Sequence, residues 1–266
     1  ELVHTASRLG MKALALTDIN ALYGALPFYR AAKEAGIQPI LGVEIQTQSQ
    51  KRAVLLAKNM KGFGEICRIV SDFHLSEKFS LVKKLSECDE NVIILASDQG
   101  LLQNLITSRG SKNICAELIA FDQYQSSRML DFSRNIGVPC VASNRVFFID
   151  KQDWEIHRLL TAIRTNSTIH SLSKDSLISP EAWLKPAKEM SRFFKECPQA
   201  LRNTLAVAEQ CQVNLPIGEI QFPPFETPHG ESHQSYLERL ARKQITHLYN
   251  PITSKIQKRL EHELQI

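Results

Sequence analysis

The chain has 266 residues, of which 43% are hydrophobic and 23% charged, with a formal net charge of +4. This composition is typical of a globular protein, and the length suits one large domain or a domain with an appendage. The apolar runs are too short for a membrane span, and the charge balance is too even to indicate nucleic-acid binding by itself.

Three further features of the sequence concern its cellular setting. The six cysteines include no CxxC pair, which predicts free thiols in a reducing cytosol. The first residues show neither the basic start nor the apolar core of a secretory signal. The sequence opens on Glu1 inside a helical pattern that covers 1–9, so we expect the natural N-terminus to lie further upstream. We therefore expect a cytoplasmic protein without membrane contact.

The first part of the chain follows the pattern of a βαβ unit. An apolar run at 13–17 ends at Asp18, a helical pattern covers 24–35, and a second apolar run at 39–45 carries Glu44. The two strands of such a unit are parallel, and their carboxyl ends meet at one edge of the sheet, where α/β proteins usually carry their chemistry. Asp18 and Glu44 are therefore candidate site residues.

Strand and helix patterns alternate up to about residue 145. The predicted strands are 53–57, 92–96, 114–119 and 138–143, and the predicted helices are 62–73, 78–87, 101–106 and 123–135. The polar stretch 46–51 is typical of a hairpin turn. The alternation predicts a parallel α/β architecture, either an open doubly wound sheet or a closed barrel.

After Asp150 the strand patterns stop. The predicted helices are 154–164, 185–194, 198–211, 232–249 and 253–266, with a polar loop at 165–180 and a Pro- and Gly-rich linker at 216–230. The apolar side of helix 154–164 carries Trp154, His157, Leu160 and Ile163. We interpret His157 there as a core histidine rather than a catalytic one.

An ordered series of segments resembles one known family along nearly the whole chain. The segments are LGMKALALTDINALYGALPFYRAAKEAGIQPILGVE, LLAKNMKGFGEICRIVS, WEIHRLLTAIRTNSTI, WLKPAKEMSRFFKECPQALRNTLAVAEQCQVNL, FPPFETPHG and KRLEHELQI. They resemble the N-terminal PHP (polymerase and histidinol phosphatase) region of bacterial DNA polymerase III alpha subunits.

The resemblance implies a distorted (β/α)7 PHP barrel followed by an α-helical extension that leads to the polymerase palm. The PHP domain would span 1–212, with the barrel strands within 1–150 and a helical part at 151–212. The Pro-rich linker and the helices leading to the palm would occupy 213–266.

The resemblance to PHP enzymes implies a metal site. In that family, His, Asp and Glu side chains at the strand ends hold a cluster of two or three metal ions, Zn²⁺ or Mn²⁺. In this chain the resemblance implies two retained ligand positions, Asp18 and Glu44. Three ligand positions are lost, at Ile19, Arg145 and Phe147. Glu117 and Asp122 lie in a further motif, CAELIAFD, and stay open as ligand positions, while an HxH motif would lie upstream of Glu1.

Several losses together imply a domain without catalytic residues or a bound metal of its own. We hypothesise that Arg145 pairs with Asp18 or Glu44 in place of the metals, so that Arg145→Ala would cost a few kcal/mol. The chain would act as a structural and interaction scaffold within a DNA-directed DNA polymerase. The alternative is a metal-dependent PHP phosphoesterase or 3′–5′ exonuclease.

The resemblance also implies partners for the intact protein. These are the palm, thumb and fingers of the same polymerase chain, a proofreading exonuclease subunit, and DNA bound through the full-length protein. The catalytic Mg²⁺ ions would belong to the palm, which lies outside these residues. A replicative and an error-prone polymerase remain equally compatible with the sequence.

Overall fold

The computed structural model describes residues 1–49, 51–173, 176–220 and 222–266. These residues form two compact units, Glu1–Leu215 and Pro216–Ile266, which are described separately. In the described residues the predicted helices and strands are all present, and their ends differ from the predicted ones by up to three residues.

The first unit is built on one six-stranded sheet with the order β1-β2-β3-β4-β5-β6. The strands are β1 (Ala13–Ile19), β2 (Gln38–Gln46), β3 (Arg52–Ala57), β4 (Val92–Ala96), β5 (Ile114–Ile119) and β6 (Cys140–Ser143). Neighbouring strands are parallel except at β3, which runs antiparallel to β2 and to β4. The α/β class is confirmed.

The sheet is mixed, which corrects the expectation of a parallel sheet throughout. The connection from β2 to β3 is a short hairpin, as predicted for this stretch, and Thr47 N donates to Lys51 O at 3.0 Å. A crossover between parallel strands needs a dozen or more residues. This connection is much shorter, and β3 must therefore run antiparallel to β2. As a result, β3 begins where the other strands end, and Arg52 stands among their carboxyl ends.

The resemblance implies seven strands, whereas the described residues form six. The backbone after β6 turns at Arg145, where φ is +45°, and this left-handed conformation cannot continue a strand. Beyond it, a single isolated parallel bridge joins Phe148 to Trp183.

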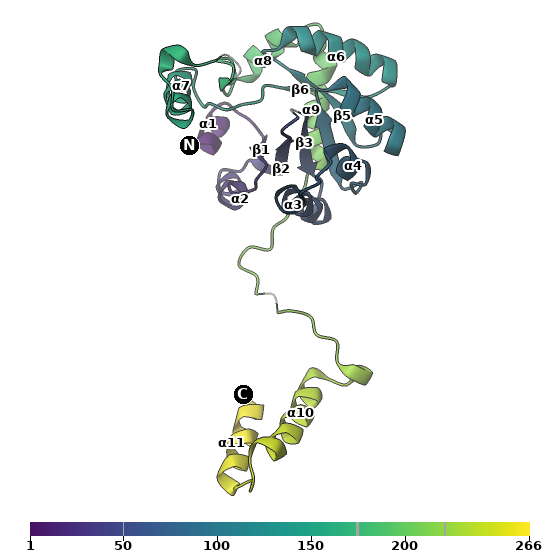
Figure 1. The fold of residues 1–266 in the computed structure, drawn as a ribbon, viewed down its shortest axis with the longest axis vertical. Helices are drawn as coiled ribbons and strands as arrows, with labels where there is room; N and C mark the ends of the chain where they lie inside the picture. The colour runs from purple at the N-terminus through teal and green to yellow at the C-terminus, as the bar shows by residue number, and fades with distance from the viewer. Residues whose placement is uncertain (50, 174–175, 221) are drawn as a thin grey trace. The chain divides into compact units, whose positions relative to one another are not determined.

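Helices cover the outer face of the sheet (Figure 1). They are α2 (Ala25–Glu34), α3 (Met60–Leu75), α4 (Leu81–Ser86), α5 (Gln99–Arg109) and α6 (Gln123–Ile136), preceded by α1 (Leu2–Arg8). Side-chain caps start several of them, for example Asn59 on α3 and Asp98 on α5. Gly137, with φ at +69°, ends α6 in the left-handed conformation that favours glycine.

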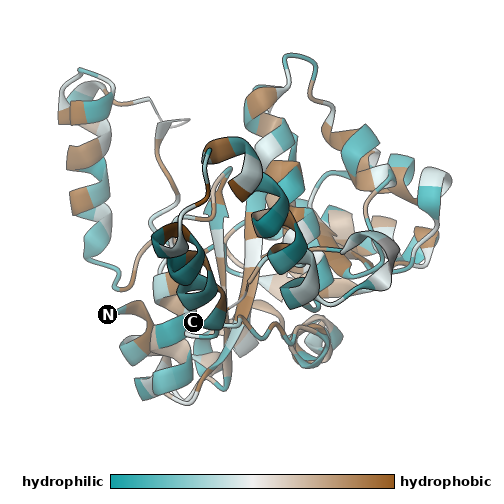
Figure 2. Ribbon diagram, turned by 90° about the horizontal axis from the view of Figure 1, so that it is seen from below, coloured by the Kyte–Doolittle hydropathy of each residue, from teal (hydrophilic) through white to brown (hydrophobic). Residues whose placement is uncertain are grey.

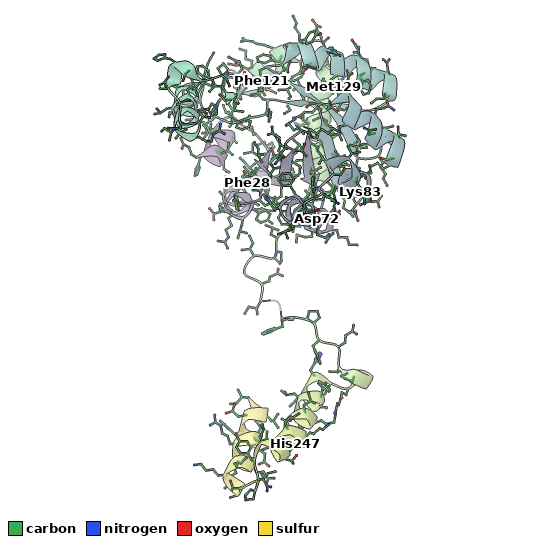
Figure 3. The ribbon with its side chains drawn as sticks, viewed as in Figure 1. Phe28, Asp72, Lys83, Phe121, Met129 and His247 are labelled. Atoms are coloured by element: carbon green, nitrogen blue, oxygen red, sulfur yellow. The ribbon has the colours of Figure 1, made fainter. Side chains whose placement is uncertain are left out.

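The strands alternate between two buried clusters. The larger cluster lies between the sheet and the outer helices and includes Phe28 of α2 and Met129 of α6, both labelled in Figure 3. The smaller cluster lies on the other face and includes Ile40, Val54, Leu56, Ile93, Leu95, Cys115 and Val141. Val207 and Cys211, on and directly after α9 (Pro198–Gln210), complete it.

Polar side chains hold α9 against this second face. Gln38 Nε2 donates to the backbone oxygens of Ala208 and Cys211, at 2.6 and 2.8 Å. Asn203 Nδ2 donates to the backbone oxygen of Cys140 at 2.7 Å. The predicted helix after the strands therefore packs into the same unit as the sheet.

Helix α7 (Asp153–Arg164) faces the protein differently from the sequence prediction. The residues that it buries are Thr161 and Ala162, and Trp154 and His157 are half-buried. Its exposed side carries an apolar stripe, defined as Ile156, Leu159, Leu160 and Ile163. Brown segments along this helix are visible at the left of Figure 2. Leu160 and Ile163 were expected on the buried side. The periodicity therefore places Trp154 and His157 correctly on the side that faces the protein, but it places Leu160 and Ile163 there wrongly.

The other helices in the described part of the first unit are short: η1 (Ile169–Ser171) and α8 (Ala187–Phe193). The second unit holds η3 (Pro228–Gly230), α10 (His233–Leu248) and α11 (Ser254–Gln265). Neither α10 nor α11 buries a residue. Apolar side chains of both helices, among them Leu248 and Ile256, line a shared open groove.

Candidate functional site

The carboxyl ends of the strands bring together a cluster of charged side chains. Glu44 on β2 and Glu117 on β5 are each only 3% exposed, and Arg52 at the start of β3 is 8% exposed. They share the face of the sheet that α9 covers further along the strands, because positions two apart on a strand point to the same side. The cluster therefore lies at the strand-end edge where chemistry was expected.

Arg52 contacts both buried carboxylates. Its Nε lies 2.9 Å from Glu44 Oε2, close enough for an ion pair although the N–H is not aligned for a hydrogen bond. Its Nη1 donates to Glu117 Oε2, and its Nη2 to Glu117 Oε1 at 3.3 Å. Nη1 also lies 3.4 Å from Ser97 Oγ, just after β4. One side chain thus joins β2, β5 and the end of β4.

Arg145 reaches the same cluster from the other end of the sheet. Its Nη2 donates to Glu44 Oε1 at 2.7 Å, and its side chain is 23% exposed. Three strands lie between β2 and β6, so a flat sheet would place these two strands about 19 Å apart. An arginine side chain cannot span that distance. The sheet is therefore curled, and the Arg145–Glu44 ion pair bridges the curl.

The loop after β6 holds Arg145 in place. The side chain of Asn144, which is buried, donates to the backbone oxygens of Trp183 and Glu181, at 2.6 and 3.3 Å. Ser143 Oγ accepts the backbone N–H of Arg145 at 3.1 Å. The guanidinium also lies 5.5 Å from the ring centroid of Phe147, a cation–π distance. These contacts support the left-handed backbone that aims Arg145 at Glu44.

The electrostatics of the cluster keep Arg52 charged. Burial by itself lowers the pKa of the Arg52 guanidinium, but the adjacent Glu117 and Glu44 carboxylates outweigh burial and raise that pKa above its ordinary value. Since arginine is protonated at all ordinary pH values, the cluster holds a permanent positive charge between two buried acids.

The other predicted site residues are spread around this cluster. Asp18 pairs with Val43 in the sheet register, so its side chain points to the opposite face from Glu44, and its Oδ2 accepts the Gly24 N–H at 2.9 Å. Ile19 is the residue in register with Glu44 and is 40% exposed. Of the two partners expected for Arg145, the structure thus selects Glu44.

The two open positions have different surroundings. Asp122 caps α6 through a hydrogen bond from the backbone N–H of Gln125, at 3.1 Å. It lines a small cavity of about 80 Å³ together with Glu117.

Phe147 is 39% exposed beside Arg145.

Arg52 is the site residue that the sequence interpretation missed. The alternation of side chains along the strand indicates a buried position for Arg52. It stands two and four positions before Val54 and Leu56, which face the second buried cluster. A charged residue in register with inward-facing positions requires a buried partner of opposite charge.

The metal cluster that the resemblance implies needs several His, Asp or Glu side chains that are free to bind metal ions. Glu44 and Glu117 are already paired with guanidinium groups, and Asp18 faces the other side of the sheet. Within the described parts of the chain, no three His, Cys, Asp or Glu side chains are grouped to hold a metal ion. The residues present do not fit a two- or three-metal site.

His157 and the cysteines have structural surroundings. His157 Nε2 accepts the backbone N–H of Ile178 at 3.1 Å, and its ring packs 5.3 Å from that of Phe148. All six cysteines are free thiols, and burial raises the pKa of Cys115 and of Cys88 to about 11. Thiols with raised pKa values are poor nucleophiles, as expected of core cysteines.

The hydrogen bond at His157 predicts a pH effect. Burial, with a smaller contribution from Arg164, lowers the pKa of His157 below its usual value, so below about pH 6.5 the unfolded chain binds more protons than the folded one. The stability that neutral His157 contributes is present above that pH and is lost as the pH falls. We expect the drop in melting temperature between pH 7.5 and 5.5 to be smaller in His157→Gln than in the parent chain. Equal drops in the two proteins would show that His157 does not titrate in this way.

Comparison with known proteins identifies the first part of the chain. Residues 1–129 match the family model described as "PHP domain". The chain carries a PHP domain. Its mixed, curled α/β sheet with following helices is the PHP-like fold that the resemblance implies.

The chain carrying this PHP domain is homologous over its whole length to bacterial polymerase subunits. It is 30% identical over 306 residues to the error-prone DNA polymerase of Symbiobacterium thermophilum and 30% identical over 292 residues to the DNA polymerase III subunit alpha of Bacillus subtilis. The Escherichia coli K12 DNA polymerase III subunit alpha is 28% identical over 307 residues. All of this chain is covered in each case, but only 28%, 26% and 26% of the relatives, so the chain spans about a quarter of their length.

A solved structure from Bifidobacterium adolescentis, described as a candidate metal-dependent phosphoesterase, is 12% identical with a TM-score of 0.36. The match covers 53% of this chain and 79% of that protein.

Among the helices of the described residues, none is long and apolar enough to cross a membrane.

Proposed function

We propose that this chain is part of a bacterial DNA-directed DNA polymerase that acts in replication or repair synthesis. In it, the PHP domain at residues 1–212 serves as a structural and interaction scaffold, and residues 213–266 lead to the palm. The homology to polymerase subunits over the whole chain supports the first part of this proposal. The observation that carries the second part is the pairing of the buried carboxylates Glu44 and Glu117 with arginine side chains.

Under this proposal Asp18 and Glu44 are vestigial metal-ligand positions, and Ile19, Arg145 and Phe147 are lost ones. The 266 residues alone neither synthesise nor cleave DNA. The Mg²⁺ ions of synthesis, and the contact with DNA, belong to the palm and the rest of a longer cytoplasmic polymerase.

The partner that we propose for the PHP domain is the remainder of the polymerase chain: its palm, thumb and fingers. The apolar stripe of α7 supports a covered surface, because Ile156, Leu159, Leu160 and Ile163 follow the helical spacing of residues that pack against another element. A proofreading exonuclease subunit is the second partner that the resemblance implies.

A second candidate function is metal-dependent cleavage, as a phosphoesterase or 3′–5′ exonuclease. The observation in its favour is the group of acidic residues at one strand-end edge, with Glu117 and Asp122 beside a small cavity. Such an activity would need divalent metals to activate a water molecule and to neutralise the phosphoryl oxygens.

Metal content and nuclease activity discriminate the two candidates. The purified chain, and a longer one that restores the upstream residues, are incubated with Zn²⁺ and Mn²⁺, desalted and analysed by mass spectrometry. Single-stranded DNA labelled at its 5′ end then reports 3′–5′ cleavage. The scaffold predicts less than about a tenth of an equivalent of metal and no cleavage, whereas a PHP nuclease requires two or three equivalents with metal-dependent cleavage.

A matched variant guards against contaminating nucleases. Glu44→Gln removes a carboxylate from the strand-end cluster and leaves the size of the side chain nearly unchanged. Cleavage that disappears in Glu44→Gln belongs to this chain and contradicts the scaffold proposal. Cleavage that is equal in both proteins comes from a contaminant and leaves the metal content as the deciding measurement.

A further inference from the structure

The two buried carboxylates at the strand ends need a counter-charge. Glu44 and Glu117 are both almost fully buried, and a buried carboxylate without a cation is strongly disfavoured. In a metal-dependent site, metal ions would supply the positive charge. Here the cation that touches both acids is a side chain of the same chain, Arg52.

We infer that the Arg52 guanidinium supplies the positive charge of this site in place of bound metal, and that its ion pairs hold β2 and β5 together across β3 and β4. The inference deepens the proposed scaffold function and rests on it. It assigns the main charge-balancing role to a residue that belongs to none of the sequence motifs discussed above.

The geometry of the guanidinium explains why this residue is an arginine. Nε faces Glu44, while Nη1 and Nη2 both face Glu117, and Nη1 also approaches Ser97. A planar group with donors on several sides makes these contacts at once, whereas a lysine ammonium is a single point charge. The contacts join strands that are not neighbours, so they hold the curl of the sheet.

Arg145 completes the charge balance. It binds Oε1 of Glu44, and Arg52 lies against Oε2, so both oxygens of this acid face a guanidinium. Two fixed positive charges thus face two acids. A divalent metal ion entering between them would meet repulsion from both arginines and would find no free carboxylate oxygen on Glu44.

The inference predicts a charge-dependent loss of stability in variants of Arg52. Arg52→Met keeps much of the side-chain volume but leaves buried Glu117 without a cation and Glu44 with Arg145 alone, and it should lower the melting temperature by about 10 °C. Glu117→Gln added to Arg52→Met removes one of these acids and should restore at least half of that loss. Arg52→Lys keeps the positive charge but lacks the planar fork of donors, so it should recover only part of that loss.

Arg68→Met is the matched control, because Arg68 forms an ion pair with Glu65 on α3 and its own side chain is 70% exposed. It should change the melting temperature by no more than about 2 °C. An Arg52→Met protein as stable as Arg68→Met would overturn the inference, and so would additive losses in Arg52→Met/Glu117→Gln.

Failure of Arg52→Met to fold leaves the test intact. In that case the double variant must fold cooperatively for the inference to hold, and its failure to fold would contradict it. Failure of the scaffold function has a separate signature, namely metal-dependent cleavage by the unsubstituted chain, whatever the melting temperatures of the variants.

Discussion

Gly62→Ala is expected to destabilise the first unit by about 3 kcal/mol. Gly62 lies in the first turn of α3, where its N–H donates to the capping oxygen of Asn59 at 3.1 Å. A Cβ at this position would lie 2.1 Å from the backbone oxygen of Asn91 and 2.9 Å from its carbonyl carbon. Because both atoms belong to the backbone, no side-chain rotation relieves the clash. Helix α3 would have to move away from the segment that leads into β4.

Gly64→Ala is the control, two positions along the same helix. The nearest atom to its added Cβ is Arg68 Nη1 at 3.8 Å, an ordinary contact with a flexible side chain. Alanine is the better helix former, so Gly64→Ala should stabilise the unit by about 0.5 to 1 kcal/mol. Urea unfolding monitored by circular dichroism measures both changes. Effects of the same sign in the two variants would contradict a close approach of α3 to Asn91.

Glu44→Ala is expected to cost about 3 kcal/mol, the typical cost of breaking a buried ion pair by removing one partner. The substitution leaves Arg145 without its acidic partner and leaves Arg52, which is buried, with Glu117 alone. Arg145→Ala should cost less, about 1 to 2 kcal/mol, because Arg145 is partly exposed and Glu44 keeps Arg52. This cost for Arg145→Ala is smaller than the few kcal/mol expected from the sequence alone, because that expectation did not include Arg52 as a second partner of Glu44.

Asp18→Ala separates the cluster from the other retained acid. Asp18 lies on the opposite face of the sheet and holds one backbone N–H, so its removal should cost about 1 kcal/mol. Denaturant midpoints of the three variants, measured at one pH and salt concentration, give the ranking Glu44 above Arg145 above Asp18. A loss in Asp18→Ala as large as that in Glu44→Ala would show that the ion-paired cluster is not the main support of this edge.

Local patterns in the sequence determine most of the secondary structure. The apolar runs at β1 and β2, the glycine that follows α6 and the polar turn before β3 are each recognisable without a fold, because backbone preferences act over a few residues. The same patterns place Glu44 at the carboxyl end of a strand. The ordered motifs also indicate the PHP family, and the resemblance predicts that Ile19 and Phe147 stand at positions where relatives carry metal ligands.

The tertiary structure alone decides which charges meet. Glu44 and Arg145 are 101 positions apart, and the curl of the sheet brings them within 2.7 Å. The register of β1 against β2 places Asp18 on the far face, which no local pattern specifies. The exposed side of α7 is likewise set by what the rest of the fold leaves uncovered, because both of its sides are apolar.

Arg52 shows both kinds of information in one residue. The alternation of β3 determines that its side chain shares a face with Val54 and Leu56, and a charge on that face needs a buried partner. Which partners it has depends on the hairpin that reverses β3 and on the curl that brings β5 close to β2. Those are long-range packing events, stabilised by burial of the two apolar clusters, and they lie beyond what neighbouring residues in the sequence can specify.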